Sequence, residues 1–312
     1  AHIPVLYHEV LALMQPRPNG RYIDGTLGAG GHTVGILQAS APNGRVLAFD
    51  QDAEAILFTR KELLEYGDRV TYVNANYAKM AILAPNYGFD EVDGILLDLG
   101  LSSRQLANGQ RGFSFNKQGP LDMRYDTTSG TTAADLINNL AESDLSEILW
   151  RFGEVRQNRR MAKHIVNNRP LYTTTELAEL ISANFPRKGR KHPATQAFQA
   201  LRIAVNQELE SVEQGVKAAA GLLKTGGRLA VISFHSLEDR FVKRYFREIS
   251  QDCICPPQQI ICTCGGRASY KLVNRKVAKA GEREISENPR SRSARLRVIE
   301  RVSKERDGAI SA

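Results

Sequence analysis

The stretch RYIDGTLGAGGHTVGILQASAPNGRVLAFDQD, residues 21–52, decides the fold. Tyr22 and Ile23 begin it in an extended run, and four glycines crowd the turn that follows. Residues 33–38 then have the composition of a short helix, and residues 46–49 resume a strand. Strand, glycine loop, helix and strand in this order form half of a nucleotide-binding βαβ unit. Glycine lets the backbone turn sharply and approach a ligand, with N–H groups at the helix start directed at an anionic group.

The glycine spacing is not that of a dinucleotide site. The loop starts with an acid, Asp24, and carries no glycine three residues after Gly30. An acid followed by Gly28 and Gly30 suits S-adenosylmethionine, which has no pyrophosphate and ends in one carboxylate and one ammonium group. Asp50, at the end of the second strand, would accept hydrogen bonds from the ribose hydroxyls. Two alternatives stay open here: a tight turn without a ligand, and Asp50 as a helix cap.

The alternation of strands and helices continues beyond this unit. A third strand ends shortly before Tyr77, and residues 92–97 form an apolar run typical of a buried central strand that delivers Asp98 to its end. Such alternation predicts an α/β fold with a doubly wound parallel sheet, whose ligands lie at the carboxyl edge. We therefore expect Asp24, Asp50, Tyr77 and Asp98 to converge at that edge.

The alternation stops after the fourth strand. Between residues 101 and 206 there is no strand pattern but several helical ones, including a capping box at Thr173. The chain is therefore predicted to have three segments. Residues 1–105 form the first part of the core and residues 106–206 an inserted all-α domain on the substrate side. Residues 207–312 form the second part of the core, with a cysteine-rich loop and a basic antiparallel hairpin.

Composition indicates a globular protein with a polyanionic partner. The 312 residues are 42% hydrophobic, no apolar run is long enough to span a membrane, and no signal peptide opens the chain, so we expect a cytoplasmic protein. The formal net charge is +8, and residues 267–306 hold 13 Lys or Arg against 5 Asp or Glu. Residues 187–191 form a second basic cluster. The alternative for each cluster is solvated surface charge.

All four cysteines fall in one short segment. Cys253, Cys255, Cys262 and Cys264 have the spacing to form a tetrahedral zinc site, although C-x-C is tighter than the usual C-x₂-C. Reduced thiols and oxidation-dependent pairing remain as alternatives.

Two polar loops follow apolar strands at the expected carboxyl edge, and they carry the candidate catalytic residues. Asp98 and Ser103 lie in the first, where their oxygens would accept N–H bonds from a nucleophilic base amine. His235 lies in the second, where it would position the base or take the released proton. The alternative for Asp98 is a capping role, and for His235 a structural contact with Glu238 or Asp239.

Six motifs in order resemble one known family, the ribosomal RNA small subunit methyltransferase H family. They are IDGTLGAGGHT, GILLDLGLSSRQL, RGFSF followed by GPLDMR, HPATQAFQALRIAVNQELE, GGRLAVISFHSLEDR and NPRSRSARLRV. The resemblance spans residues 2–302. It implies a class I S-adenosylmethionine-dependent methyltransferase that methylates N4 of a cytosine in the decoding region of 16S rRNA, with small-subunit rRNA or the small ribosomal subunit as its partner.

The resemblance also assigns cofactor contacts by motif. They fall on Gly30, Gly31, His32, Asp50, Tyr77, Asp98 and Gln105. Tyr77 stands where the family often has phenylalanine, and stacking on adenine is still possible. The cysteine cluster is not general in the family, so the resemblance says nothing about zinc.

Rival functions remain beside this hypothesis. One is a methyltransferase acting on another RNA or DNA amino group. Another is a noncatalytic RNA-binding assembly factor, which needs the basic segments but no cofactor site. A dinucleotide-dependent oxidoreductase would also use Asp50, but the third glycine of its motif is absent. For the oligomeric state, monomer and homodimer both stay open.

Overall fold

The computed structural model describes residues 4–186, 192–253 and 268–302, together with residues 255, 258, 259, 261, 263 and 266. Two compact units make up the chain: unit 1 comprises Ala1–Gly100 and Ser211–Ala312, and unit 2 comprises Leu101–Glu210. These boundaries lie near the positions 105/106 and 206/207 at which the sequence places the domain boundaries. The basic cluster at residues 187–191 lies outside the described residues.

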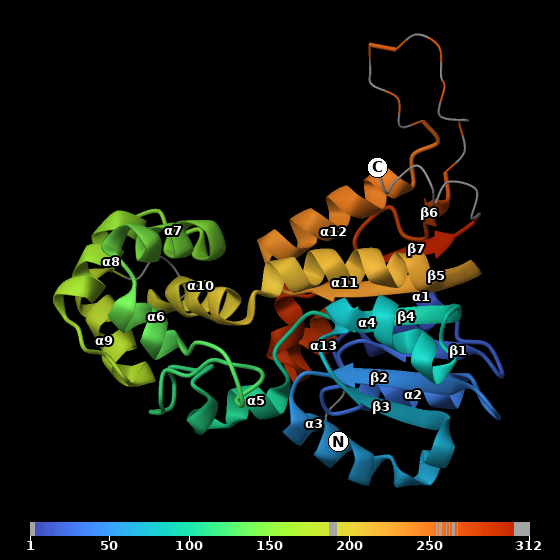
Figure 1. Cartoon of the computed structure of the whole chain (residues 1–312), viewed down its shortest axis with the longest axis horizontal. Helices are drawn as coiled ribbons and strands as arrows, with labels where there is room; N and C mark the ends of the chain where they lie inside the picture. Colours follow the sequence, from blue (N-terminus) through green and yellow to red (C-terminus); the bar gives the residue numbers. More distant parts are fainter. Residues whose placement is uncertain are drawn as a thin grey trace. The chain divides into compact units, whose positions relative to one another are not determined.

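Unit 1 is built on a seven-stranded sheet of order β3-β2-β1-β4-β5-β7-β6 (Figure 1). Its strands are β1 Arg21–Asp24, β2 Arg45–Asp50, β3 Val70–Asn74, β4 Val92–Asp98, β5 Leu223–Ser233, β6 Tyr270–Leu272 and β7 Arg295–Arg301. The first five run parallel, and β7 pairs antiparallel with both β5 and β6. The predicted doubly wound sheet and its final antiparallel pair are therefore confirmed. The pair is not a tight hairpin, because α13 Glu282–Glu287 and η5 Pro289–Ser293 lie between its strands.

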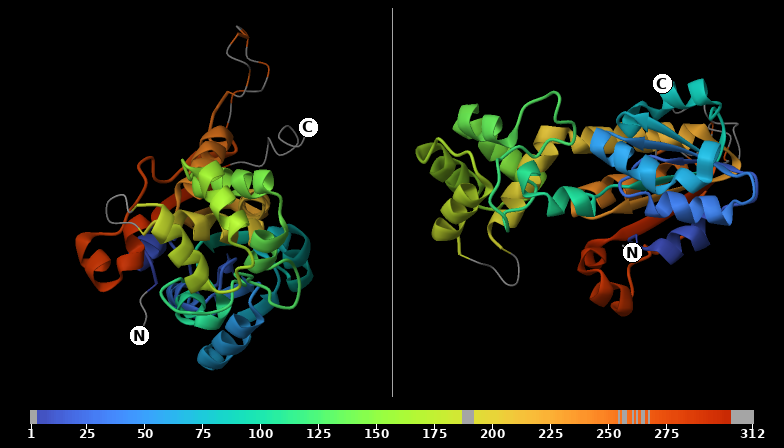
Figure 2. Two further views of the ribbon diagram at one scale, coloured as in Figure 1. Left: turned by 90° about the vertical axis from the view of Figure 1, so that its left-hand side faces the viewer. Right: turned by 90° about the horizontal axis from the view of Figure 1, so that it is seen from below.

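Alternate residues of the central strands feed two apolar cores. Ile23, Leu47 and Ile95 lie in the core on one face of the sheet, whereas Tyr22 and Val46 lie in the core on the other face. All five side chains are at most 1% exposed. Because both faces of the sheet are covered, its strands are nearly continuous apolar runs. Figure 2 shows helices on both sides of the sheet.

The helices of unit 1 connect these strands. They are α1 Tyr7–Met14, α2 Gly31–Ala39, α3 Ala53–Glu62, η1 Leu64–Arg69, η2 Tyr77–Lys79, α4 Met80–Leu83, η3 Ala84–Tyr87, α11 Glu208–Leu222, which starts in unit 2, and α12 Ser236–Ile249. The sequence predicts one helix over residues 53–66 with Ile56, Leu57, Leu63 and Leu64 on its apolar positions. Ile56 and Leu63 are buried as predicted, whereas the end of the helix and the other two leucines are predicted wrongly. The α-helix ends at Glu62, and Leu57 and Leu64 are 61% and 74% exposed.

Unit 2 is helical and has its own core. It contains α5 Ser103–Ala107, η4 Gly109–Arg111, α6 Ala133–Asn139, α7 Glu142–Gly153, α8 Asn158–Asn167, α9 Thr174–Asn184 and α10 Ala194–Asn206. Thr173 and Glu176 form the predicted capping box of α9. Leu145, Leu177 and Leu201 are fully buried in one cluster formed from these helices.

The single helix that the sequence predicts over residues 205–223 is interrupted. Gln207 adopts a left-handed conformation with φ of 48°, which ends α10 before α11 begins at Glu208. Arg202 clamps this corner by donating two hydrogen bonds to the Glu208 carboxylate, at 2.8 and 2.9 Å. At the other end, β5 starts at Leu223, so Gly226 lies inside the strand where its register with β4 shifts. No helix among the described residues has the length and apolar composition to cross a bilayer.

Candidate active site

The glycine loop between β1 and α2 has the conformation that glycine alone adopts readily. Gly28 and Gly30 have φ of 52° and 79°, in the left-handed region. Gly30 precedes α2, and a Cβ placed on it would lie 2.6 Å from Cγ2 of Thr59. Conformation and close packing therefore both require glycine at this turn.

Asp24 stabilises this loop through hydrogen bonds to its carboxylate. Its carboxylate accepts hydrogen bonds from the Thr33 hydroxyl at 2.7 Å and the Thr26 N–H at 3.0 Å, and its residue is 1% exposed. Burial raises the pKa of Asp24, and these hydrogen bonds oppose that rise. Asp24 thus lies at the carboxyl edge as predicted, but its oxygens bind the loop itself.

Asp50 closes the other side of the loop. Its carboxylate accepts the Gly28 N–H at 2.8 Å and the Asp52 N–H at 2.9 Å. Burial raises the pKa of Asp50 to about 6, because it outweighs those hydrogen bonds. Each carboxylate oxygen keeps a second acceptor position, which suits a vicinal diol such as ribose.

Asp98 is the least satisfied acid of the edge. Its N–H donates to the Thr26 hydroxyl at 2.7 Å, which fixes its backbone to the glycine loop. Its Oδ2 lies 3.8 Å from Nε2 of His32, and its Oδ1 has no hydrogen-bond partner among the described residues. Burial and the nearby negative charges of Asp24 and Glu238 raise the pKa of Asp98 to about 7.

His32 completes this polar group. It is 6% exposed, its ring stacks on Tyr7, and its ring nitrogens lie buried near the Val5 backbone, with no hydrogen bond of good geometry within the described part of the chain. Burial lowers the pKa of His32 to about 4, so the ring is neutral at pH 7. Buried polar atoms without partners are rare in folded proteins. Those of His32 and Asp98 therefore fit a site that a polar ligand completes.

Tyr77 lies at the end of β3 with its ring against α11. It is 9% exposed, and a Cβ on Gly215 would lie 2.3 Å from the ring. The sequence brings Tyr77 to the edge through its position after the third strand. It gives no sign that Gly215, far along the chain, makes room for the ring.

Two predicted site residues belong to unit 2. Gln105 shares a capping box with Ser102: each accepts the other's N–H, at 3.0 and 3.2 Å. Ser103 is the first residue of α5, and its side chain lies outside the described residues.

His235 makes the structural contact that the sequence analysis held as an alternative. Its Nδ1 accepts the Glu238 N–H at 3.5 Å, and its Nε2 lies 3.1 Å from Oε1 of Glu238. Oε2 of Glu238 in turn accepts the Phe234 N–H at 2.8 Å. His235 and Glu238 therefore form the capping box of α12.

Comparison with known proteins decides the family. A model of the MraW methylase family matches residues 1–302. The chain belongs to the MraW methylase family. A ribosomal RNA small subunit methyltransferase H of Geobacter sp. (strain M21) is 50% identical over 307 residues, which cover 96% of this chain and 98% of the relative. Its counterpart in Thermomicrobium roseum is 49% identical, over 97% of this chain and 94% of the relative.

A solved structure with a similar fold is far less similar in sequence than these relatives. A putative rRNA methylase from Clostridium thermocellum is 14% identical, with a TM-score of 0.45 over 97% of this chain and 100% of its own. At this TM-score the likeness adds nothing to the strand order itself. The methylase fold therefore rests on the seven-stranded sheet with its reversed β7 and on the family match.

Sequence reasoning missed several residues that build this methylase site. Thr26 and Thr33 tie the loop to Asp98 and Asp24. Thr33 lies nine residues after Asp24, and nothing in that spacing signals a contact. Glu238, three residues after His235, carries the readable pattern of a capping box, and that pattern identifies the role of both residues.

The cysteine segment of this methylase is described in part. Cys253 is exposed and Cys255 half-buried, whereas Cys262 and Cys264 lie outside the described residues. The zinc site therefore stays a prediction.

Proposed function

We propose that this chain transfers a methyl group from S-adenosylmethionine to the exocyclic N4 of a cytosine in the decoding region of 16S rRNA. The observation that carries the proposal is the unpartnered Asp98 carboxylate oxygen beside a neutral His32, at the end of a glycine loop in a methylase-family chain. The relatives' name, ribosomal RNA small subunit methyltransferase H, supports the choice of RNA.

The cofactor contacts follow from the chemistry of the edge. S-adenosylmethionine supplies an electrophilic methyl carbon on a positively charged sulfur, which leaves as a neutral thioether when an amine attacks. Asp50 would accept hydrogen bonds from the ribose hydroxyls, and Tyr77 would hold the adenine. Asp98 and the loop at Gly30, Gly31 and His32 bind the amino-acid end. Gln105 would contact the cofactor, as its family motif implies.

The acceptor amine needs help because its lone pair is delocalised into the cytosine ring. A target base must leave its stack to reach a site of this kind. Asp98 accepts a hydrogen bond from the amine N–H and so directs the nitrogen lone pair at the methyl carbon. The role of Ser103 stays a prediction from the sequence. With a pKa near 7, Asp98 is a suitable acceptor for the proton that leaves the nitrogen. His235 holds the start of α12 behind this site.

The test is methylation of small ribosomal subunits that lack the modification. They are incubated with donor labelled in the methyl group, the rRNA is digested to nucleosides, and the labelled product is mapped. The expected result is N4-methylcytidine from the decoding region. Label on a ring carbon or on adenine contradicts the proposal. Salt-dependent RNA binding without turnover favours a noncatalytic assembly factor instead.

Zinc is a separate part of the proposal. Cys253, Cys255, Cys262 and Cys264 would bind one structural Zn²⁺ as four thiolates. Metal analysis of protein purified without chelator is expected to give one equivalent of zinc, and its absence removes the zinc site without affecting the methylation proposal.

A further inference from the structure

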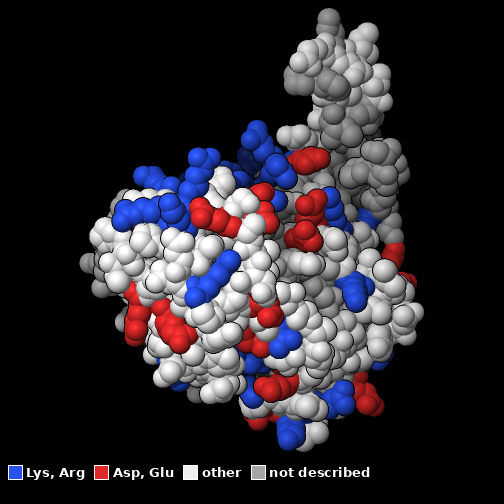
Figure 3. Space-filling view, turned by 60° about the vertical axis from the view of Figure 1, so that its left-hand side comes forward, with Lys and Arg blue, Asp and Glu red and all other residues white. Residues whose placement is uncertain are grey.

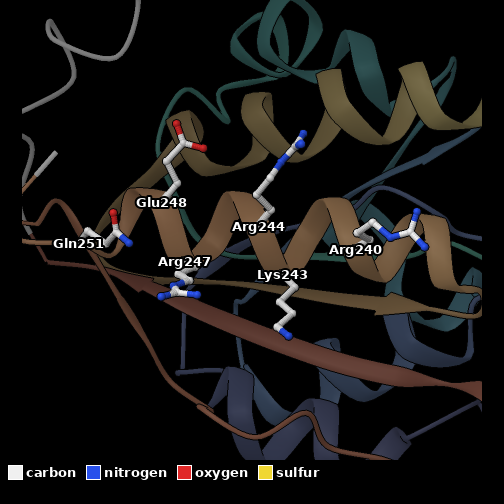
Figure 4. A pocket seen from close by; sticks show the side chains of 6 residues that line it. All are labelled: Arg240, Lys243, Arg244, Arg247, Glu248 and Gln251. Atoms are coloured by element: carbon white, nitrogen blue, oxygen red, sulfur yellow. The ribbon is translucent and has the colours of Figure 1, made fainter. Parts of the chain in front are cut away.

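The outer face of α12 is rich in exposed cations. Val242, Phe246 and Ile249 turn inward and are at most 5% exposed. At 100° per residue, the opposite face consists of polar and charged side chains alone. They are Arg240, Lys243, Arg244, Arg247, Glu248 and Gln251, which line an open depression (Figure 4). We call these six residues the α12 basic face.

Two exposed cations on other helices lie one turn after an acid that pairs with them. Lys217 on α11 pairs with Glu213, and Arg151 on α7 pairs with Glu147, each four residues earlier. Such pairs stabilise a helix slightly. They explain those cations without a partner molecule.

The α12 basic face has the opposite pattern. Arg244 follows Arg240 by four residues and Arg247 follows Lys243 by four, and like charges at this spacing destabilise a helix slightly. Glu248, four residues after Arg244, is the one acid of the face. Lys243, Arg244 and Arg247 form no ion pair within the described residues. Figure 4 shows Lys243 and Arg247 extending from one side of the helix, and Arg244 with Glu248 from the other. With four cations and one acid the face has an excess of positive charge, which favours binding of an external anion.

Position links this face to the active site. α12 starts at Ser236, directly after β5 reaches the carboxyl edge, and Glu238 in its first turn is near enough to Asp98 to raise that group's pKa. From Arg240 to Arg247 the face extends roughly 10 Å along the helix. A strand that places one base at Asp98 can therefore continue along these cations. Figure 3 shows Lys and Arg side chains gathered along the upper edge of the view, whereas lower down they are scattered among Asp and Glu.

We propose that the α12 basic face binds the phosphodiester backbone of the substrate RNA next to the target base; this rests on the proposed function. The negative charge of the phosphates complements the positive charge of the Lys and Arg side chains, and phosphate contacts carry no sequence preference. An anionic membrane surface fits less well. Interfacial helices insert an apolar face into the bilayer, and that of α12 is buried against the sheet.

The test compares Lys243→Gln/Arg247→Gln with a control that loses the same charge, Arg45→Gln/Lys61→Gln. The control residues are exposed, and Arg45 opens β2 at the opposite edge of the sheet. Affinity for unmethylated small subunits and for protein-free 16S rRNA is measured against salt concentration. Donor affinity and thermal unfolding report on the fold. The α12 variant is expected to bind RNA about tenfold more weakly at low salt, with a salt slope reduced by about 1 to 2, because each lost phosphate contact lowers that slope by about 1.

At saturating RNA the α12 variant is expected to keep the wild-type kcat and donor affinity. Unchanged RNA affinity and salt slope overturn the proposal, and so does an equal loss in the control variant. Binding of the wild type to phosphatidylserine vesicles that the α12 variant loses, with RNA binding intact, assigns the face to lipid instead. If the wild type binds RNA through this face but methylates no cytosine, the methylation proposal alone fails.

Discussion

At the scale of single residues, the site combines three acids whose ionisation is made unfavourable by burial. Asp24, Asp50 and Asp98 lie around one loop, and burial raises the pKa of each. For Asp24, hydrogen bonds that its carboxylate accepts from Thr33 and Thr26 partly offset this cost of burial. Asp98 has no such compensation at Oδ1. The unsatisfied acid is therefore the one that a bound ammonium or amine would stabilise most.

Donor binding is expected to depend on pH through Asp98 and Asp50. Their folded-state pKa values of about 7 and about 6 exceed the ordinary value of 3.8, so both groups gain protons as pH falls through that range. The donor needs the carboxylates, and we expect its affinity to fall at least about tenfold between pH 8 and pH 5. Calorimetric titration across this range checks it, and constant affinity contradicts it.

Asp98→Asn is expected to weaken donor binding and to stabilise the ligand-free protein. A raised carboxyl pKa means that the stability contribution is present at low pH and is lost as pH rises through about 7. The neutral amide avoids this loss. At pH 8 the ligand-free variant should therefore unfold at a higher temperature than the wild type, with the difference vanishing toward pH 4. Its donor affinity should fall at least about tenfold. Full methyltransferase activity of the variant would show that Asp98 neither binds the donor nor accepts the proton of the amine.

His235→Asn separates a cap from a proton acceptor. Asparagine caps helices as well as any residue, so stability should be retained, whereas His235→Leu should lose about 1 kcal/mol of the free energy of unfolding. For a structural histidine, kcat of the asparagine variant stays within about twofold and its pH–rate profile is unchanged. A loss of a hundredfold in kcat with an intact fold would instead assign His235 to the reaction.

The sequence predicts much of the site because the acids follow apolar strands. Asp50 and Asp98 end β2 and β4, and parallel strands bring such residues to one edge. Side-chain orientation is not encoded in that pattern. Whether His235 faces a ligand or Glu238, and whether Asp24 faces outward or into its own loop, depends on contacts that only the folded chain sets.

At the scale of elements, α12 and β7 are joined by a buried ionic cluster. Asp239 on α12 is 8% exposed and accepts hydrogen bonds from Arg297 at 2.7 Å and Arg295 at 2.8 Å on β7. Although burial opposes it, these arginines hold the pKa of Asp239 below its ordinary value. The reversed strand is thereby attached to the helix that leaves the carboxyl edge.

Asp239→Asn is expected to cost roughly 3 to 5 kcal/mol of the free energy of unfolding at pH 7, because it leaves partly buried arginines uncompensated. Glu213→Gln, which breaks the exposed pair with Lys217, should cost less than about 1 kcal/mol. Urea unfolding measures both. Since the pKa of Asp239 is depressed, its contribution should persist above pH 4 and disappear as pH falls further. Equal effects of the two variants would contradict a buried role.

Element existence was predictable, and element ends were not. Apolar runs such as residues 92–97 and the capping box at Thr173 are strong local signals. The break at Gln207 has no glycine or proline to mark it, because its left-handed turn is held by the Arg202–Glu208 contact. Leu57 has the helical spacing of a core residue and is exposed, because α3 has no further layer outside it to cover that face.

At the scale of the whole molecule, the sheet and the helical unit each have a core of their own. Clusters on the two faces of the sheet belong to unit 1, and a third belongs to unit 2. No contact between the units is needed to account for either core. Each unit is therefore expected to respond locally to the loss of a core side chain.

Leu201→Ala and Leu229→Ala form a matched pair for this expectation. Both leucines are fully buried, the first in unit 2 and the second on β5 in unit 1. Each substitution should cost roughly 2 to 5 kcal/mol. Hydrogen exchange should accelerate mainly in unit 2 for Leu201→Ala, with donor affinity kept, and mainly in unit 1 for Leu229→Ala. Acceleration across both units for either variant would contradict separate cores.

The most direct test of the central claim is a crystal structure of the chain soaked with S-adenosylhomocysteine, the demethylated donor. We expect the nucleoside between Asp50 and Tyr77, with the amino-acid end at the glycine loop beside His32 and Asp98. Density for the ligand at any other place, or an edge left empty at saturating ligand, would contradict it.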